Sequence, residues 1–358
     1  MKIAIVLGTR PEIIKFSPII RECQKKGLNF FILHTAQHYT DYMDSIFFRD
    51  LELPQPKYNL GVRSGKQGEQ VGKMLIGIEE VLEEEKPDVV LVQGDTNSVL
   101  AGALAAAKMG IKVGHVEAGL RSYDRTMPEE INRVVADHLS DYLFAPTQKA
   151  VATLIKEGIE KSKIFLTGNT IVDAVFQNLD IAQRKSQIFK KLKLQPREYF
   201  LLTLHRPSNV DNREVFAGIL KGLELIYKKS QQKIVFPVHP RTQKQLDTFQ
   251  LKLPEGIIAI EPISYLDFLS LEKSASLCLT DSGGVQEEAC ILKIPCVTIR
   301  ENTERPESLE VGANILAGTS PTKILSSVQE MLTRKSNWPN PFGDGKSAKR
   351  ILEIVLKG

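Results

Sequence analysis

Residues 2–15 read KIAIVLGTRPEIIK, and they contain the structural unit from which most of the chain is built. Ile3 to Leu7 form a short apolar run of the kind that makes a strand buried on both faces. Gly8 permits a tight turn after that run, and Pro11 suits the first position of a helix. The stretch therefore predicts a strand, a tight turn and a helix in direct succession.

The same alternation recurs along the rest of the chain. Further strand-like apolar runs occupy residues 30–33, 89–92, 200–202, 234–238, 277–279 and 295–299. Helix-like segments fall between them at residues 11–26, 68–85, 98–108, 213–229 and 322–334. Strands that alternate with helices predict parallel sheets with right-handed crossovers, so the expected fold class is α/β, with doubly wound, Rossmann-like domains.

The length of the chain predicts two domains. Its 358 residues exceed the roughly 250 to 300 that one hydrophobic core supports. A polar helical stretch, AQRKSQIFKKLKLQP at 182–196, follows the strand-like KIFLTG and marks a boundary near residue 168. We expect an N-terminal domain at 1–168 and a C-terminal domain at 169–345, with an amphipathic helix at 346–358 that returns to the first domain.

The composition excludes several functional classes. The chain is 42% hydrophobic and 25% charged, and no apolar run approaches the ~20 residues that a membrane span needs. Its four cysteines form no C-x-x-C pair, and no histidine stands at zinc-ligand spacing. The net charge of +4 comes from mixed charges without a basic stripe. We expect a reduced, metal-free cytoplasmic protein with no membrane span and no nucleic-acid partner.

Basic residues follow the first predicted strand. Arg10 and Lys15 lie near the N-terminus of the first predicted helix, where the free backbone N–H groups already favour anions. A phosphate is the natural partner for this arrangement. The alternative is that Arg10 pairs only with a surface carboxylate.

Acidic residues follow two other predicted strands. Asp95 comes after PDVVLVQ, and Glu117 comes after the strand that begins at Ile111. Glu129 and Glu130 open a helix about twelve residues later. Taken singly, Asp95 could be a helix N-cap and Glu129 a first-turn acid. Clustered at one sheet edge, such acids raise one another's pKa, a cost that proteins accept for catalysis or cation binding.

The second half carries polar strand ends of its own. His205 and Arg206 follow the strand at 200–202, where His205 could carry a proton or pair with a charge. His115 falls within a strand pattern, so we expect it to be packed, and His138 falls within a helix. The remaining histidines lie near strand ends and stay open as candidates: His34, His38 and His239.

The strongest single motif is LCLTDSGGVQEEA at 277–289. A buried strand runs into Ser282, Gly283 and Gly284 and then into a helix, which is the pattern of a diphosphate cradle. Glu288 is placed to accept hydrogen bonds from sugar hydroxyls, and RENTERPE adds Glu304 and Arg305 after another strand. The alternative is a simple connecting turn. No G-x-G-x-x-G fingerprint follows the first strand and no Walker motif occurs, so no dinucleotide or ATP cofactor is expected.

Nine motifs occur together and in order along the chain: GTRPEIIK, TAQH, PDVVLVQGDT, VGHVEAGLR, PEEINR, TGNTIVDA, PVHP, LTDSGGVQEEA and TERPE. Because it carries this set of motifs, the chain closely resembles the non-hydrolysing UDP-N-acetylglucosamine 2-epimerases. The resemblance extends from Lys2 to the final helix. The resemblance implies a glycosyltransferase-B type architecture with an interdomain cleft, a cytoplasmic homodimer without cofactors, and interconversion of UDP-N-acetylglucosamine (UDP-GlcNAc) and UDP-N-acetylmannosamine (UDP-ManNAc).

The resemblance also implies roles for individual residues. Asp95, Glu117 and Glu129 match the family's catalytic carboxylates, and His205 matches its active-site histidine. Positions that hold UDP or the sugar are matched by Arg10, Lys15, Phe268, Ser282, Gly283, Gly284, Glu288 and Arg305. Positions of an effector site in bacterial members are matched by Gln37, His38, Arg63, Glu130, Arg206 and His239. The chain departs from some members at Ile263, where they have glutamine near the uracil, and at Thr40, where they have a second glutamine.

The hydrogen on C2 of the sugar is not next to a carbonyl, so we expect elimination of UDP to 2-acetamidoglucal followed by readdition. Three alternatives remain open at this point. The first is a glycosyltransferase on the same fold, and the second is an epimerase of a UDP-diacetamido-uronic acid. The third is a sugar-nucleotide sensor without catalytic activity.

Overall fold

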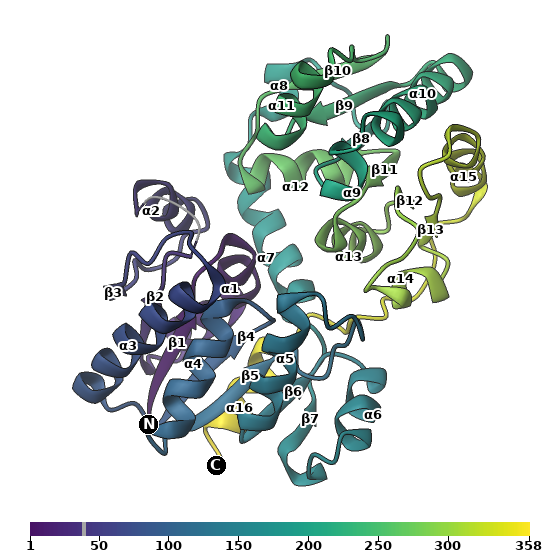
Figure 1. Ribbon diagram of the computed structural model, residues 1–358. Helices are drawn as coiled ribbons and strands as arrows, with labels where there is room; N and C mark the ends of the chain where they lie inside the picture. The colour runs from purple at the N-terminus through teal and green to yellow at the C-terminus, as the bar shows by residue number, and fades with distance from the viewer. Residues whose placement is uncertain (38–40) are drawn as a thin grey trace. The chain divides into compact units, whose positions relative to one another are not determined.

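The structure of the chain is a computed structural model that describes residues 1–37 and 41–358 (Figure 1). The chain forms two compact units: unit 1 comprises Met1–Gln177 with Phe342–Gly358, and unit 2 comprises Asn178–Pro341. The first division falls inside helix α7 (Thr170–Lys185), later than the boundary near residue 168 that the sequence suggested. The first residues of α7, such as Val172 and Val175, are fully buried.

Unit 1 is built on a parallel sheet with the strand order β3-β2-β1-β4-β5-β6-β7. Its strands are β1 (Lys2–Leu7), β2 (Asn29–His34), β3 (Tyr58–Asn59), β4 (Val89–Gln93), β5 (Lys112–Val116), β6 (Tyr142–Ala145) and β7 (Ile164–Leu166). Its helices, besides the start of α7, are α1 (Arg10–Lys25), α2 (Asp41–Asp50), α3 (Gln67–Glu85), α4 (Asn97–Lys108), α5 (Pro128–Leu139), α6 (Gln148–Lys156), a 3-10 turn (Lys161–Lys163) and α16 (Ser347–Val355).

The core of unit 1 lies against the central strands. β1 and β4 are buried along almost their whole length because helices cover both faces of the sheet, as their continuous apolar sequences require. Helix α4 approaches these strands closely, and a Cβ atom at Gly102 would lie 3.0 Å from Val92 and 3.2 Å from Val6. Small residues on α4 therefore set the distance between the helix and the sheet.

Helix α16 completes unit 1 although it comes last in the chain. It packs against α1, as Figure 1 shows in yellow. The buried carboxylate of Asp173 in α7 accepts hydrogen bonds from the backbone N–H groups of Ser347 (3.2 Å) and Ala348 (3.1 Å). These are first-turn N–H groups that have no partner inside the helix, so Asp173 anchors the N-terminus of α16.

Unit 2 repeats the architecture with the strand order β10-β9-β8-β11-β12-β13, again parallel. Its strands are β8 (Tyr199–Thr203), β9 (Lys233–Pro237), β10 (Ile257–Ile260), β11 (Leu277–Thr280), β12 (Cys296–Thr298) and β13 (Asn314–Leu316). Its helices are α8 (Ile188–Leu192), α9 (Pro207–Val210), α10 (Arg213–Ser230), α11 (Pro240–Phe249), α12 (Tyr265–Ser274), α13 (Gly283–Leu292), α14 (Pro306–Glu310) and α15 (Pro321–Thr333).

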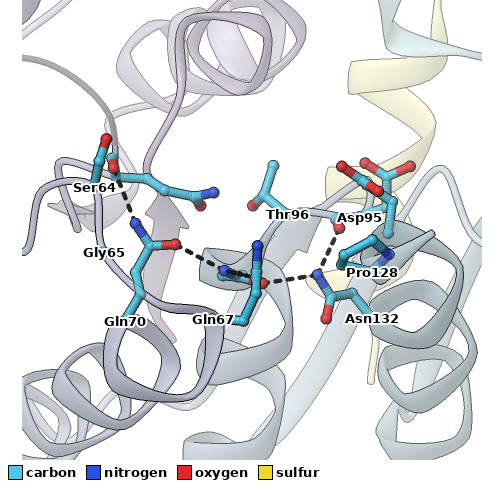
Figure 2. A pocket seen from close by; sticks show the side chains of 11 residues that line it. Ser64, Gly65, Gln67, Gln70, Asp95, Thr96, Pro128 and Asn132 are labelled. Atoms are coloured by element: carbon cyan, nitrogen blue, oxygen red, sulfur yellow. Dashed lines mark hydrogen bonds between the residues drawn. The ribbon is translucent and has the colours of Figure 1, made fainter. Parts of the chain in front are cut away.

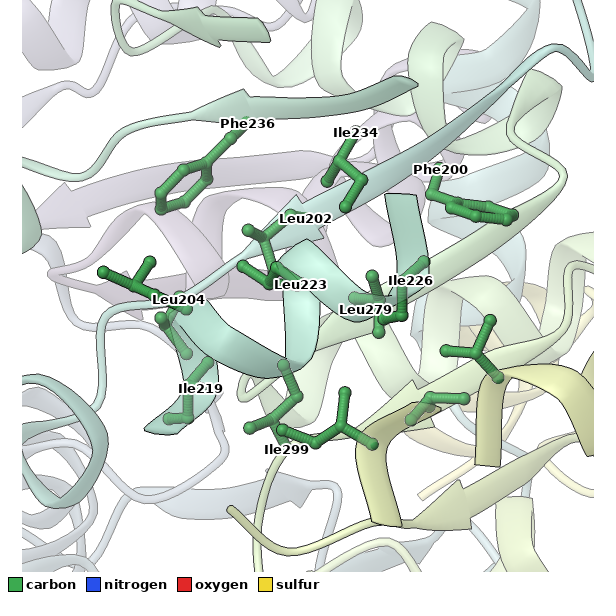
Figure 3. Close-up of a cluster of buried hydrophobic side chains, with 14 of the residues drawn as sticks. Phe200, Leu202, Leu204, Ile219, Leu223, Ile226, Ile234, Phe236, Leu279 and Ile299 are labelled. Atoms are coloured by element: carbon green, nitrogen blue, oxygen red, sulfur yellow. The ribbon is translucent and has the colours of Figure 1, made fainter. Parts of the chain in front are cut away.

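The core of unit 2 gathers around strands β8, β9 and β11. Figure 3 shows Phe200, Leu202 and Leu279 from the strands packed with Leu223 and Ile226 of α10. Each such side chain contributes about 1.5 to 3 kcal/mol when it is fully buried. The predicted fold class, α/β with two doubly wound units, is therefore confirmed.

Each sheet has one point at which the strand order reverses, between β1 and β4 in unit 1 and between β8 and β11 in unit 2. Ligands of doubly wound sheets bind beyond the carboxyl ends of the strands at such points. Among the described residues, no helix is both long enough and apolar enough to cross a membrane.

Candidate active site

The loop after β1 passes very close to two hydroxyl groups. A Cβ atom at Gly8 would lie 2.1 Å from both Thr35 Oγ1 and Ser98 Oγ, so only glycine fits there. The two hydroxyls are themselves 2.7 Å apart. Arg10 begins helix α1, and its guanidinium lies 5.7 Å from the centre of the Phe47 ring. The predicted anion-binding loop is therefore held rigidly at the strand-order reversal of unit 1.

A polar pocket of about 230 Å³ opens at this edge of unit 1 (Figure 2). It contains three of the predicted site residues, Gln37, Asp95 and Glu129. The other residues that line it are Ser64, Gly65, Gln67, Gln70, Thr96, Asn97, Pro128 and Asn132. Side-chain amides dominate this lining, and such groups suit the hydroxyl and carbonyl groups of a sugar.

The amides of the pocket hold one another in place. Asn97 Nδ2 donates to Gln67 Oε1 and Gln70 Oε1, both at 2.7 Å. Asn132 Nδ2 donates to Asn97 Oδ1 (3.1 Å) and to the backbone oxygen of Asp95 (2.9 Å), as Figure 2 shows. These residues were not predicted from the sequence. Two patterns could have indicated them: polar residues directly after a strand, as in GDTN, and polar residues in the first turns of a helix, as in PEEIN.

Asp95 is held by an arginine of the next helix. Its carboxylate forms a short ion pair with Arg133 Nη2, and its side chain is 37% exposed. The N-cap interpretation of Asp95 is wrong, because Thr96 is the N-cap of α4 and its hydroxyl accepts from the Val99 N–H group. Arg133 was not predicted, although its place on the same helix as Glu129 and Glu130 was a usable signal. Asp95 is thus oriented yet accessible.

The two acids that open α5 differ in environment. Glu129 is exposed in the first turn and lines the pocket. Glu130 is buried and accepts from the backbone N–H groups of Ser122 and Tyr123, each at 2.9 Å, and from Arg133 at 2.8 Å. Burial alone would raise the pKa of Glu130, but these donors outweigh it and lower that pKa. The carboxylate of Glu130 therefore fastens the loop before α5.

Glu117 follows β5 directly beside the loop that carries Asp95. The Gly94 N–H group donates to the Val116 backbone oxygen at 3.1 Å. Gly94 precedes Asp95 and Val116 precedes Glu117, so this bond connects the backbone next to the two acids. Glu117 adopts a left-handed backbone conformation, with φ of 71°. Its carboxylate receives Lys15 Nζ at 2.6 and 2.7 Å. Lys15, predicted to contact UDP or the sugar, is thus brought against a predicted catalytic acid.

Glu12 is a buried acid that the sequence analysis missed. It accepts from the Gly8 N–H group (3.0 Å) and from the hydroxyls of Thr9 and Thr96 (2.8 Å each). Burial raises its pKa to about 7, against the opposing effect of these donors. The spacing of threonine and glutamate in TRPE, typical of a capping box, could have revealed it. Glu12 links the loops after β1 and β4.

The predicted effector positions are distributed over both units. In unit 1, Gln37 and Arg63 lie near each other, because Gln70 Nε2 donates to the backbone oxygens of both residues at 3.1 and 2.7 Å. Arg206 and His239 belong to unit 2. His38 and Thr40 lie outside the described residues.

The loop after β8 in unit 2 is organised by Asp281, a buried acid at the end of β11. Its carboxylate accepts from the backbone N–H groups of His205 (2.9 Å) and Arg206 (2.8 Å). His205 Nε2 lies 3.8 Å from Asp281, and its ring centre is 5.4 Å from that of His239. Burial lowers the pKa of His239, and the neighbouring His205 and Arg241 lower it further. Asp281 was not predicted as a site residue.

Ser282 is the N-cap residue of α13, but its hydroxyl does not cap the helix. The N–H groups of the first turn have no partner within the helix, so this terminus favours an anion. A Cβ atom at Gly283 would lie 4.0 Å from Glu304, whose carboxylate is paired with Arg300 (2.7 Å). Burial would raise the pKa of Glu304, but Arg300 and Arg206 outweigh it, and the pKa falls to about 2.

Other predicted residues of unit 2 lie on α12, α13 and α14. Arg305 Nε is 2.9 Å from Glu287 Oε1, so α13 and the start of α14 are joined by an ion pair. Glu288 is buried and accepts from the Tyr265 hydroxyl at 2.8 Å. Phe268 is half-buried on α12. No group of three or more His, Cys, Asp or Glu residues in the described part of the chain could hold a metal ion.

Comparisons with known proteins identify close relatives. A family model described as UDP-N-acetylglucosamine 2-epimerase matches residues 21–356. The chain is 58% identical to UDP-N-acetylglucosamine 2-epimerase of Methanocaldococcus jannaschii, over the full length of both proteins. It is also 58% identical to the protein of that name from Methanococcus maripaludis, over 99% of this chain and 98% of the relative. A crystal structure of the Methanocaldococcus jannaschii enzyme in complex with UDP-GlcNAc and UDP superposes with a TM-score of 0.91, covering all of both chains.

Proposed function

Because the chain belongs to the UDP-N-acetylglucosamine 2-epimerase family, we propose that it is an isomerase that interconverts UDP-GlcNAc and UDP-ManNAc. The observation that carries this proposal is the 58% identity, over the whole chain, to proteins of that name. Groups that such a reaction needs follow strands β4 and β5 in unit 1, where Asp95 and Glu117 stand, and strand β11 in unit 2, where the helix terminus at Ser282 can bind an anion.

We propose that the reaction proceeds by elimination and readdition. The bond between C1 of the sugar and the diphosphate oxygen breaks, and UDP leaves with the bonding electrons. A base removes the proton from C2, whose electrons form the C1–C2 double bond of 2-acetamidoglucal. A proton then adds to the opposite face of C2, and a diphosphate oxygen of UDP forms a new bond to C1. Atoms and charge balance, and only the configuration at C2 changes.

Unit 2 supplies the groups that hold the leaving diphosphate in this proposal. The helix terminus at Ser282, Gly283 and Gly284 donates backbone N–H groups to the developing negative charge. Arg305 contributes positive charge, and His205, whose Nε2 lies 3.8 Å from Asp281, can donate or accept a proton. Glu288, which accepts a hydrogen bond from Tyr265, is assigned to the ribose hydroxyls.

Unit 1 supplies the acids that move the proton. Opposite faces of C2 lose and gain a proton, so two different groups are needed. Asp95 and Glu129 line the same pocket, and Glu117 follows the strand next to Asp95. Basic side chains hold two of these carboxylates, since Arg133 binds Asp95 and Lys15 binds Glu117. Arg10 and the amides of the pocket orient the sugar nucleotide.

The other functions that the sequence left open are not favoured. The relatives at 58% identity bear the name of the epimerase of the simpler sugar, rather than that of a glycosyltransferase or of an epimerase of a diacetamido-uronic acid. A sensor without catalytic activity would not need two acids held at defined positions by ion pairs, Asp95 by Arg133 and Glu117 by Lys15.

The test is an NMR time course with UDP-GlcNAc alone in deuterated water. We expect UDP-ManNAc to form and deuterium to enter at C2 of both sugars. Asp95→Asn and Glu117→Gln should each slow the reaction by about a hundredfold or more. Glu224→Gln, at a half-buried acid of α10 that pairs with Lys228, is the control and should leave the rate unchanged. Binding of UDP-GlcNAc without exchange or product would overturn the proposal.

We further propose that the protein is a cytoplasmic homodimer, as the family resemblance implies. All four cysteines are free and buried, which suits a reducing compartment. Sedimentation velocity at micromolar concentration should give a single species of twice the chain mass. A monomer at that concentration would count against the dimer and leave the catalytic proposal standing.

A further inference from the structure

A buried network of charged side chains lies beneath the loops that follow β4 and β5. His115 in β5 lies at its centre and is fully buried. Asp137 in α5 is only 1% exposed. His115 Nδ1 lies 2.7 Å from Asp137 Oδ1, and His115 Nε2 lies 2.8 Å from the backbone oxygen of Gly94. Both ring nitrogens are thus engaged at hydrogen-bond distance.

Both partners of this ring can only accept hydrogen bonds. A backbone carbonyl has no proton, and the Asp137 carboxylate already accepts from the Gly119 N–H group (3.1 Å) and from Arg121 (2.7 Å). A neutral imidazole offers one donor and one lone pair, whereas the imidazolium offers two donors. Two acceptors at 2.7 and 2.8 Å therefore require a proton on each nitrogen, so the ring is positively charged.

The surrounding charges balance this state. Arg121 bridges Asp137 and Glu157, reaching Glu157 at 2.6 and 2.9 Å, so two cations face two anions. Glu117 also faces the ring, and it is paired with Lys15 of α1. Burial alone would lower the pKa of His115, but Asp137, its hydrogen bonds and Glu117 together raise it. A buried ion network of this kind persists only when every charge is compensated.

We propose that His115 is a positioning residue for the epimerase reaction, and that its charged ring holds the loops carrying Asp95 and Glu117 in register. One nitrogen binds the carbonyl of Gly94, the residue directly before Asp95. The other binds Asp137, which in turn holds the N–H group of Gly119, two residues after Glu117. His115 touches no substrate in this role, and the inference rests on the proposed function.

These loops need such support because the backbone of Glu117 is strained. Its φ of 71° lies in the left-handed region, which Gly94 (φ 86°) and Gly119 (φ 83°) adopt without a steric penalty. A left-handed glutamate is sterically unfavourable and persists only where its surroundings hold it. Because a displacement of about 1 Å can slow catalysis about a hundredfold, loose loops would cost rate rather than substrate affinity.

The kinetic test compares His115→Gln with Glu224→Gln. Glu224 lies on α10 of unit 2 and pairs with Lys221 and Lys228, so it serves as a control outside the buried network. We expect His115→Gln to lower kcat about 10- to 100-fold while KM for UDP-GlcNAc stays within about twofold, and the control to do neither. Equal kcat values for the two variants would overturn the inference. An inactive wild-type protein would instead overturn the proposed function.

A second measurement uses the wild-type protein, so it does not depend on how a variant folds. Nitrogen-15 NMR of the histidine rings, followed against pH, reports the protonation of each ring directly. We expect one buried ring to keep both nitrogens protonated at a pH where exposed histidines have already become neutral, and kcat should fall only where that ring loses its proton. A neutral His115 ring at pH 7 together with full kcat would overturn the inference.

Discussion

Two acids are buried to the same degree, one in each unit, yet burial is accompanied by a lowered pKa in one and a raised pKa in the other. Asp137 of unit 1 is 1% exposed and Glu272 of unit 2 is fully buried. Burial raises the pKa of both, but at Asp137 the charges of His115 and Arg121 outweigh it, and the pKa falls. Burial and the neighbouring carboxyl of Glu288 act in the same direction on Glu272, and its pKa rises well above the usual value.

The difference shows that the partner, and not the depth of burial, decides the charge of a buried acid. Neither oxygen of Glu272 has an N–H or O–H donor from the described residues, so its own proton, shared with Glu288, is what satisfies the pair. The carboxylate of Asp137 accepts from three partners, His115, Arg121 and the Gly119 N–H group, and stays ionised. One acid acts as an anchor for cations, and the other acts as a neutral donor.

The largest effect should come from Asp137→Asn, which removes the anion of unit 1 while keeping its size. His115 and Arg121 would then be buried cations without their shared partner. We expect the free energy of unfolding at pH 7 to fall by about 3 to 5 kcal/mol. Urea denaturation followed by circular dichroism measures it. A loss below about 1 kcal/mol would mean that the network is not ionised.

Glu12 tests the same comparison by its dependence on pH. Its donors among the described residues are neutral, the Gly8 N–H group and two threonine hydroxyls, and burial raises its pKa to about 7. Its folded-state pKa lies above the unfolded value of about 4.5, so the native state binds the proton more tightly, and stability is lost as pH rises through that window. Between pH 5 and pH 8 we expect the wild type to lose about 2 to 3 kcal/mol relative to Glu12→Gln. Parallel pH profiles of unfolding for the two proteins would refute this.

Glu272→Gln repeats the change from acid to amide in unit 2 and should have the opposite sign to Asp137→Asn. The amide needs no proton to enter the core and can still donate to Glu288. We therefore expect the variant to be as stable as the wild type at pH 7, or more stable by about 1 kcal/mol, with the difference growing as pH rises. Destabilisation comparable to that of Asp137→Asn would remove the contrast between the units.

The smallest effect should come from a half-buried acid on the surface of a helix. Glu224 on α10 contacts Lys221 and Lys228, which lower its pKa to about 2. Such an exposed pair gains little in water and is screened by salt. Glu224→Gln should leave the unfolding midpoint unchanged, in low salt and in 1 M salt alike. A shift at low salt that vanishes at high salt would show a real surface contribution.

Most of the secondary structure could be predicted from local signals. The run at Ile3 to Leu7, the glycine after it and the proline at position 11 specify β1, the turn and α1 without reference to the rest of the chain. The runs at 89–92 and 277–279 likewise predict β4 and β11. Because polar residues that follow such runs must emerge at one sheet edge, Asp95 and Ser282 could be assigned to the strand ends.

The partners of these residues could not be predicted, because they depend on how helices pack back onto the sheet. Arg133 reaches Asp95 from a distance of 38 residues, and Asp137 reaches His115 from 22 residues away. His115 was correctly expected to be packed, but a strand pattern carries no information about which charge it meets. The division inside α7 was also hidden, since a continuous helix gives no break in the sequence.

The return of α16 to unit 1 has a consequence for the order of folding during synthesis. Unit 2 is continuous in the chain and can acquire all its strands while the ribosome is still translating. Unit 1 begins earlier yet remains incomplete until the residues that bind Asp173 have emerged. The half that is translated first is therefore the half that finishes last, and the face of α1 against which α16 packs stays uncovered in the meantime.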